Sequence, residues 1–197
     1  MNDKLYLRTL THNDINDNYL SWFKDGEVTS FLEVNGNKLT KQMVTDYIDE
    51  GIKTESYYMY AICTIENDLH IGNLKVGPIN RKHHVADLVC VIGDKRFWGK
   101  GLATQAIALG NKLAFEKYQI RKLHGQIYAD NIGSIKAYCK AGWIIEGVIE
   151  GRYLVNGKPM DQILVSCNNP MFFTTNNIDY NLNKLKDLIA FRKSFTE

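Results

Sequence analysis

The sequence has little of what marks secreted, membrane-spanning or nucleic-acid-binding proteins. Its 197 residues include four cysteines, which lie far apart and form no Cys-x-x-Cys pair of the metal-binding type. The formal net charge is +2, and no long basic block argues for a nucleic-acid partner. No apolar run approaches membrane-spanning length, and the first residues lack the apolar core of a signal peptide. We therefore expect a cytoplasmic protein with no metal, membrane or nucleic-acid partner.

The composition is that of an ordinary globular protein. Hydrophobic residues make up 45% and charged residues 23% of the chain, which is long enough for one domain with a full core. Three of the four cysteines lie in apolar strand-like or helix-like runs, which predicts buried free thiols in a reducing compartment. The four are Cys63, Cys90, Cys139 and Cys167.

Apolar periodicity predicts alternating strands and helices along the chain. A meander of strands comes before a glycine-rich turn, so the first half of the sheet is expected to be antiparallel. The predicted strands are residues 5–10, 57–65, 69–79, 85–92, 123–129, 143–150 and 162–167. The predicted helices are one capped by Thr11 or Asn13 that runs through Phe23, a short turn over 28–32, and residues 40–51, 102–118 and 132–140.

Two glycines stand between the strand predicted over 85–92 and the helix predicted over 102–118. Gly99 and Gly101 leave the backbone bare where that helix begins. Bare amides at the positive end of a helix dipole attract phosphate oxygens, so this segment predicts a pyrophosphate-binding loop. Positive residues nearby add to the attraction, namely Lys95, Arg96 and Lys100.

Other nucleotide-binding loops fit this segment less well. A dinucleotide site would have three spaced glycines early in the chain, and here Ala103 stands at the third position. A nucleoside-triphosphatase loop would follow Gly-Lys with Ser or Thr, whereas Gly101 follows Lys100. A plain tight connection between a strand and a helix is the remaining alternative.

A second block of residues agrees with the first and is found independently of it. The pattern Arg-x-x-Gly-x-Gly over 96–101, followed by Leu-Ala-Thr, resembles the acyl-CoA pyrophosphate loop of the GNAT superfamily of N-acetyltransferases. Residues 131–143 resemble that superfamily's Asn-x-x-Ser-x-x-x-Tyr-x-x-x-Gly-Phe segment, with Trp143 in place of Phe. The resemblance covers residues 4–167 and is closest to the branch that acetylates ribosomal-protein N-termini and polyamines.

The resemblance implies a fold, a co-substrate and a set of binding residues. The fold would be one α/β (α+β) domain over 1–167, with a mixed, largely antiparallel twisted sheet of about seven strands flanked by helices. Acetyl-CoA would be the co-substrate, the acetyl group would pass directly to an amine in a ternary complex, and no metal would take part. The residues that would bind the coenzyme are Val91, Arg96, Trp98, Gly99, Lys100, Gly101, Leu102, Ala103, Asn131, Ser134 and Tyr138.

Tyr138 is the expected general acid. Acetyl transfer from a thioester to an amine needs an acceptor for the amine proton and a donor for the leaving thiolate. In the resembling family the matching tyrosine lies near the coenzyme sulfur. Ser134 precedes it by one helical turn on the same face and would hold the pantetheine or polarise the tyrosine. The simpler alternatives are core packing for Tyr138, a surface position for Ser134 and a helix cap for Asn131.

Asp87 is the candidate for the catalytic base. It occupies about the place where related enzymes carry an acidic residue directed at the acceptor amine. Strict alternation puts it on one face with Val85, Val89 and Val91, and a bulge in this strand, usual in the family, would change that phase. Other candidates stay unranked, namely His83 and His84 at a turn, Glu33, Glu146 and Glu150.

The acceptor is expected to be a small-molecule or peptide amine. Polyamine enzymes that look like this one carry many acidic residues in their first helices, whereas here lysines accompany the acids over residues 38–53. A protein N-terminus and an amino group on a nucleotide-linked sugar are comparable options. Core packing is favoured over an acceptor pocket for Trp22, Phe23 and Phe31. A coenzyme-A-binding sensor or interaction module without turnover is the alternative to an enzyme.

The composition changes after Cys167. An Asn/Thr-rich stretch leads into apolar residues at helical spacing, which predicts an amphipathic helix over 178–195 in a C-terminal extension, 168–197. This helix would pack on its own domain or on a second subunit, so a homodimer is one expectation.

Overall fold

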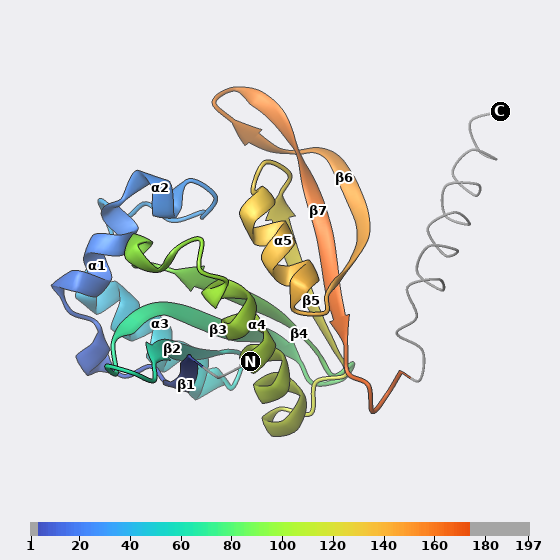
Figure 1. The fold of residues 1–197 in the computed structure, drawn as a ribbon, viewed down its shortest axis with the longest axis horizontal. Coiled ribbons are helices and arrows are strands. Elements are labelled where there is room, and N and C mark those ends of the chain that lie inside the picture. The colour runs from blue at the N-terminus through green and yellow to red at the C-terminus, as the bar shows by residue number, and fades with distance from the viewer. Residues whose placement is uncertain (1–3, 174–197) are drawn as a thin grey trace.

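A seven-stranded twisted sheet with helices on both faces forms the fold (Figure 1). The computed structural model describes residues 4–173, so the helix expected over 178–195 lies outside the described residues. The strand order is β1-β2-β3-β4-β5-β7-β6, and every neighbouring pair is antiparallel except the parallel pair β4 and β5. This confirms the expected α/β fold class. The strands are β1 Leu5–Thr9, β2 Tyr58–Thr64, β3 His70–Asn80, β4 Val85–Ile92, β5 Lys122–Tyr128, β6 Ile144–Val155 and β7 Lys158–Asn168.

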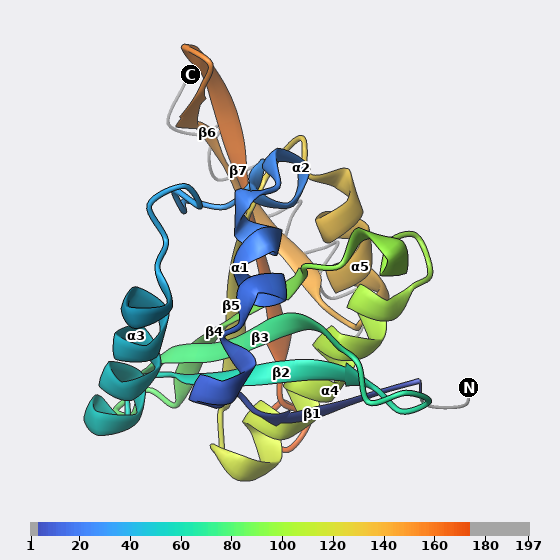
Figure 2. The same cartoon turned by 90° about the vertical axis from the view of Figure 1, so that its left-hand side faces the viewer.

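Helices α1 and α3 lie on one side of the sheet, and α4 and α5 lie on the other (Figure 2). We call these sides the α3 face and the α4 face. The helices are η1 His12–Asp14, α1 Asp17–Lys24, α2 Gly26–Thr29, α3 Lys41–Thr54, η2 Lys95–Phe97, α4 Leu102–Lys117 and α5 Ile132–Lys140.

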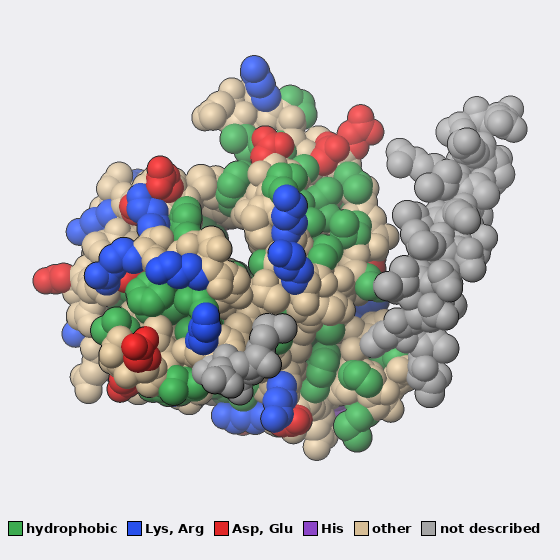
Figure 3. Space-filling model, viewed as in Figure 1, with side chains coloured by type: hydrophobic (Ala, Val, Ile, Leu, Met, Phe, Trp, Pro, Cys, Tyr) green, Lys and Arg blue, Asp and Glu red, His purple; other side chains and the backbone are tan. Residues whose placement is uncertain are grey.

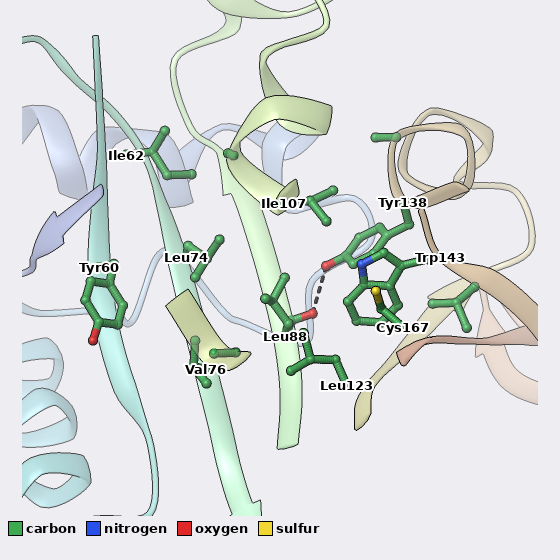
Figure 4. Packing of buried hydrophobic residues seen from close by; sticks show 14 of the residues in the cluster. Tyr60, Ile62, Leu74, Val76, Leu88, Ile107, Leu123, Tyr138, Trp143 and Cys167 are labelled. Atoms are coloured by element: carbon green, nitrogen blue, oxygen red, sulfur yellow. Dashed lines mark hydrogen bonds between the residues drawn. The ribbon is translucent and has the colours of Figure 1, made fainter. Parts of the chain in front are cut away.

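Each face of the sheet buries its own hydrophobic cluster. The α4-face cluster joins Leu88 of β4, Ile107 of α4 and Tyr138 of α5 (Figure 4). The α3-face cluster packs Trp22 of α1 and Ile48 of α3 against the opposite side. Fully burying one such aliphatic side chain contributes about 1.5–3 kcal/mol, so the two clusters fix the helices on both sides of the sheet.

Two predicted helix boundaries are wrong, and side-chain contacts explain both. The Asn16 side chain accepts a hydrogen bond from the Tyr19 amide and caps α1, whereas Thr11 precedes the separate turn η1. Helix α3 continues to Thr54 and does not stop at Gly51. A Cβ at Gly51 would lie 2.5 Å from the Tyr57 ring, so glycine is needed there for packing and not for ending the helix.

Of the two alternatives left open for β4, the structure has strict alternation and no bulge in this strand. The register shift between β3 and β4 falls between Val76 and Ile79, where β3 has the additional residue. Gly77 in that stretch has a φ of +122°, which favours glycine. Consequently Leu88 packs in the α4-face cluster, while Asp87 and its neighbours two and four residues on share the α3 face.

The four cysteines are free thiols, and their burial differs from the expectation. Cys63 and Cys167 are buried and Cys90 is intermediate, whereas Cys139 is exposed. Helical periodicity places Cys139 beside the buried Tyr138 but on the solvent side of α5.

Candidate active site

The two parallel strands in the middle of the sheet separate after three residue pairs. Strand β4 pairs with β5 only where Val85–Asp87 meets Lys122–His124. A cavity of about 480 Å³ lies where the strands part. Its walls come from β4, the loop before α4, the start of α4, α5 and the segment around α2. They include Glu27, Phe31, Cys90, Val91, Trp98, Gly99, Gly101, Leu102, Ala103, Thr104, Asn131, Ser134, Lys136, Tyr138 and Lys140.

The glycine loop presents open backbone to this cavity. Gly99 and Gly101 have φ values of +72° and +75°, and an added Cβ at either position would meet no heavy atom within 4 Å. Gly101 is the N-cap of the 16-residue helix α4. The first amides of a helix have no acceptor within it and carry the positive end of its dipole. The loop can therefore bind an anionic group.

The positive side chains of the loop are engaged with other groups. Arg96 pairs with Asp94 at 2.6 Å, and this hydrogen-bonded contact raises the pKa of Arg96 and lowers that of Asp94. Lys95 lies 2.7 Å from both Asp25 and Glu27. Lys100 lies over the Phe97 ring, 5.5 Å from its centroid. Neither Arg96 nor Lys100 lines the cavity, and their contact with the coenzyme stays a prediction.

Two lysines that the sequence analysis did not single out do line the cavity. Lys136 and Lys140 lie one turn apart on α5, and both are exposed. Figure 3 shows a hollow between the α2 region and α5, with Lys and Arg side chains along the α5 side. Lys136 and Lys140 are spaced i, i+4 in the block that contains Ser134, and this spacing is the sequence signal that could have found them.

The structure brings most of the predicted binding residues together around the cavity. The Trp98 indole donates a hydrogen bond to the Ile92 carbonyl at 2.7 Å, which holds the loop against the end of β4. The Asn131 side chain accepts a hydrogen bond from the Ser134 amide at 3.1 Å and caps α5. The predicted residues that line the cavity are Val91, Trp98, Gly99, Gly101, Leu102, Ala103, Asn131, Ser134 and Tyr138.

Tyr138 places its hydroxyl at the edge of the gap between the strands. The side chain is 5% exposed and packs edge-on against Trp143. Its hydroxyl donates to the Leu88 carbonyl at 2.8 Å, and Leu88 directly follows the last paired residue of β4 (Figure 4). Burial raises the pKa of Tyr138, so the phenol stays protonated at neutral pH and its hydroxyl has a proton to donate.

Asp87 lies on the opposite face of β4 from Tyr138. Its side chain is half-buried and is absent from the cavity wall. Burial raises its pKa, and the charges of His124 and Lys75 partly offset that rise. The predicted acid and the predicted base are therefore on two sides of one strand.

An aromatic cluster, which we call the aromatic wall, begins in the cavity lining at Phe31 and extends away from it. Trp22 is buried in the core as expected, whereas Phe31 lines the cavity, contrary to the favoured interpretation. The Phe31 and Tyr128 rings are 5.7 Å apart, and Tyr128 stacks on Tyr153 with centroids 3.8 Å apart. The Tyr128 hydroxyl donates to Glu33 at 3.3 Å. This wall offers aromatic faces and a carboxylate, the groups that favour a cation.

A cysteine thiol also lines the cavity. Burial raises the pKa of Cys90 to about 12, so the thiol stays protonated at neutral pH. A protonated thiol is a poor nucleophile, which disfavours a covalent intermediate on Cys90.

The described residues form neither a metal-binding cluster nor a membrane-spanning helix. Residues 4–173 contain no group of three or more His, Cys, Asp or Glu side chains placed to hold a metal ion. No helix within the same range has the length and apolar character needed to cross a membrane.

Comparison with protein families and curated proteins gives concordant matches. The family model described as an acetyltransferase (GNAT) domain matches residues 4–144. The probable N-acetyltransferase YjcK of Bacillus subtilis is 25% identical over 175 residues, which are 84% of this chain and 94% of that protein. The spermidine N(1)-acetyltransferase of Escherichia coli K12 is 28% identical over 116 residues, 58% of this chain and 60% of that protein.

Solved structures share the fold at low sequence identity. Spermidine N-acetyltransferase from Vibrio cholerae, in complex with CoA and spermine, has a TM-score of 0.77 and 18% identity, covering 87% of this chain and 99% of that chain. Ribosomal-protein-S5-alanine acetyltransferase from Vibrio fischeri has a TM-score of 0.74 and 17% identity, covering 87% and 96%.

Proposed function

This chain belongs to the GNAT acetyltransferase family and is an N-acetyltransferase, and from that premise we propose that it moves the acetyl group of acetyl-CoA directly to a small primary amine. The observation that carries the proposal is the cavity beside the unpaired end of β4, which is lined by the glycine loop, the start of α4 and Tyr138 of α5.

The residues around the cavity fit a coenzyme with a diphosphate at one end. Gly99 and Gly101 leave open space beside helix amides that have no partner within α4, which suits phosphate oxygens. Lys136 and Lys140 add mobile positive charge at the rim. The second half of β4 would offer its backbone groups to the amides of the pantetheine arm.

The chemistry that the chain itself would supply is proton transfer and positioning. Acetyl-CoA brings an activated acetyl thioester. Tyr138 keeps its proton and would give it to the departing thiolate, exchanging its hydrogen bond to Leu88. Ser134 would hold the thioester end of the coenzyme one helical turn away. Because the Cys90 thiol stays protonated, direct transfer is favoured over a covalent enzyme intermediate.

The acceptor would enter against the aromatic wall. Phe31 and Tyr128 provide ring faces, and Glu33, which accepts a hydrogen bond from the Tyr128 hydroxyl, provides a carboxylate. A primary amine is cationic before it reacts, and aromatic faces with a nearby carboxylate attract such a group. The names of the spermidine-acetylating relatives support a polyamine among the candidates, beside amino sugars and peptide N-termini.

The test is release of the CoA thiol from acetyl-CoA, measured against a panel of amines. The panel should include spermidine, spermine, amino sugars, aminoglycosides and peptides with free N-termini. Amine-dependent thiol release with a matching acetylated product would support the proposal. Tight CoA binding by calorimetry with no release for any amine would favour the alternative, a coenzyme-A-binding sensor or interaction module.

A further inference from the structure

Three polar side chains form a row across the strands at the point where β4 and β5 part. Asp87 of β4 is in register with His124 of β5, and His124 is in register with Ser166 of β7. Their neighbours Leu88, Leu123 and Val165 all belong to the α4-face cluster. Because side chains alternate along a strand, the row lies on the α3 face.

The row is enclosed at its Ser166 end and is close to open surface at Asp87 and His124. Ser166 is 0% exposed, and its Oγ has no hydrogen-bond partner among the described residues. Asp87 and His124 are half-buried. On the same face, two residues beyond Asp87 and His124, Val89 is 40% exposed and Gln126 is exposed. A molecule on the α3 face could therefore reach the row at the opening of the gap.

The row and the Tyr138 hydroxyl lie at the same level of β4. Tyr138 donates to the carbonyl of Leu88, the residue directly after Asp87, from the α4 face. One proton donor and one potential proton acceptor thus stand on opposite faces of the sheet, with the gap between β4 and β5 beside both. An acetyl transfer needs these two groups on the two sides of the reacting carbon.

We propose that His124 is the general base that takes the proton from the acceptor amine, with its register neighbour Asp87 as the carboxylate that stabilises the charged imidazole. The inference rests on the proposed function. The amine nitrogen forms its bond to the acetyl carbon, the carbon–sulfur bond breaks, the amine proton passes to His124, and Tyr138 protonates the thiolate. Asp87 stabilises the imidazolium that results, and the buried Ser166 hydroxyl lies on the other side of His124 in register.

The charges around His124 are consistent with this role. Burial lowers the pKa of His124, Lys122 and Arg121 lower it further, and Asp87 and Glu146 raise it. Burial raises the pKa of Asp87, which His124 and Lys75 lower. The imidazole is therefore neutral near pH 7, and a neutral imidazole can accept a proton. Asp87 is the base that the sequence suggested, but by itself it does not provide a neutral imidazole that could accept the proton.

The first experiment compares pH–rate profiles of the unmodified enzyme, His124→Gln and His12→Gln. His12 is an exposed histidine of η1 that pairs with Asp49 of α3, and it serves as the matched control. At pH 7 we expect His124→Gln to lower kcat/KM for an alkyl amine by about 10²-fold or more. The loss in kcat/KM should become smaller as the pH rises, because a larger fraction of the amine in solution is then already neutral. A parental profile in His124→Gln would overturn the inference.

The second experiment separates the roles of His124 and Asp87. It adds an NMR titration, which does not depend on turnover, to the rate profile. The five imidazole signals are titrated by NMR, and the signal missing in His124→Gln identifies His124. Asp87→Asn removes a charge that raises the pKa of His124, so the midpoint and the acid limb of the rate profile should both move to lower pH. An unmoved midpoint, or an acid limb abolished by Asp87→Asn but kept by His124→Gln, would overturn the inference.

The two levels of proposal fail in different ways. No thiol release by the unmodified enzyme with any amine would overturn the proposed function. The NMR midpoint would still test whether the charge of Asp87 raises the pKa of His124. Active unmodified enzyme with a fully active His124→Gln variant would overturn only the role of His124. Ser166→Ala should shift the midpoint less than Asp87→Asn, because it removes a neutral group.

Discussion

The coenzyme side of the cavity is built from neighbouring residues, whereas its proposed acceptor side is assembled from distant segments. Gly99, Gly101 and the start of α4 are consecutive in sequence, and α5 adds one further short block. The aromatic wall joins Phe31 after α2 with Tyr128 of β5 and Tyr153 of β6. A site made from local turns leaves a motif in the sequence, and a site made from tertiary contacts leaves none.

The largest expected effect tests the junction of the two sides. Tyr138→Phe keeps the ring against Trp143 and removes the hydroxyl that is the proposed proton donor. Single-turnover acetylation should therefore slow by about 10²–10⁴-fold. CoA affinity should change little, since one hydrogen bond contributes about 0.5–1.5 kcal/mol net. Single-turnover kinetics are needed because slow product release could mask the chemical step. A parental rate would mean that Tyr138 is not the acid.

The next effect belongs to the coenzyme side alone. Gly101 has a φ of +75°, which costs other residues about 1–2 kcal/mol, so Gly101→Val should weaken CoA binding about tenfold or more in calorimetry. Gly101→Asn tolerates that backbone better and should lose affinity only if its side chain occupies phosphate space. Gly26→Ala is the control, because Gly26 has open space around its Cβ position and no positive φ. Unchanged affinity in a folded Gly101→Val protein would reject the phosphate assignment.

A smaller effect should fall on the acceptor side alone. Tyr128→Leu removes a ring next to Phe31 and the donor to Glu33, so the KM for the amine should rise by about 3- to 30-fold while CoA affinity stays constant. Tyr6→Leu is the matched control, because the Tyr6 hydroxyl also donates to a carboxylate, that of Asp68, but on the distant strand β1. A rise in the Kd for CoA without a change in KM would show that the two sides are not separable in this way.

The smallest effect concerns the link between the two sides. Lys95 joins the coenzyme loop to Asp25 and Glu27 of the α2 region, but all three side chains are substantially exposed. Exposed ion pairs contribute about 0.2–1 kcal/mol, so Lys95→Met should change the KM for the amine less than about fivefold. Steady-state kinetics at low and high salt would check this, since screening should remove the difference. A change far beyond fivefold would mean that the sides are tightly coupled.

The lesson about prediction follows from particular residues. The helix over 132–140 agrees with α5 to the residue, because Asn131 and Gly142 bound it with a cap and a positive φ of +89°. The start of α1 was missed because Thr11, Asn13 and Asn16 are all capable caps, and only Asn16 has the Tyr19 amide within reach. A bulge was considered only for the strand over 85–92, whereas the register shift falls at Gly77 in the preceding strand.

The candidate site shows the same division. The glycine loop, Asn131, Ser134 and Tyr138 were predicted from two sequence blocks, and all of them lie around the cavity. Arg96 and Lys100 were expected to contact the coenzyme because of their charge. In the structure they contact Asp94 and Phe97, and sequence does not show which partner a flexible cation selects.

By itself the sequence determined the order of strands and helices, the family and the glycine loop at the start of α4, because each depends on residues that are close together in the chain. Only the tertiary structure decided which side chains face one another across the gap between β4 and β5. The parallel register that aligns Asp87 with His124, and the antiparallel register that aligns His124 with Ser166, depend on how β4, β5 and β7 pair. Such pairing is set by the burial of whole strand faces, and a shift of one residue would turn each of these side chains to the opposite side of the sheet.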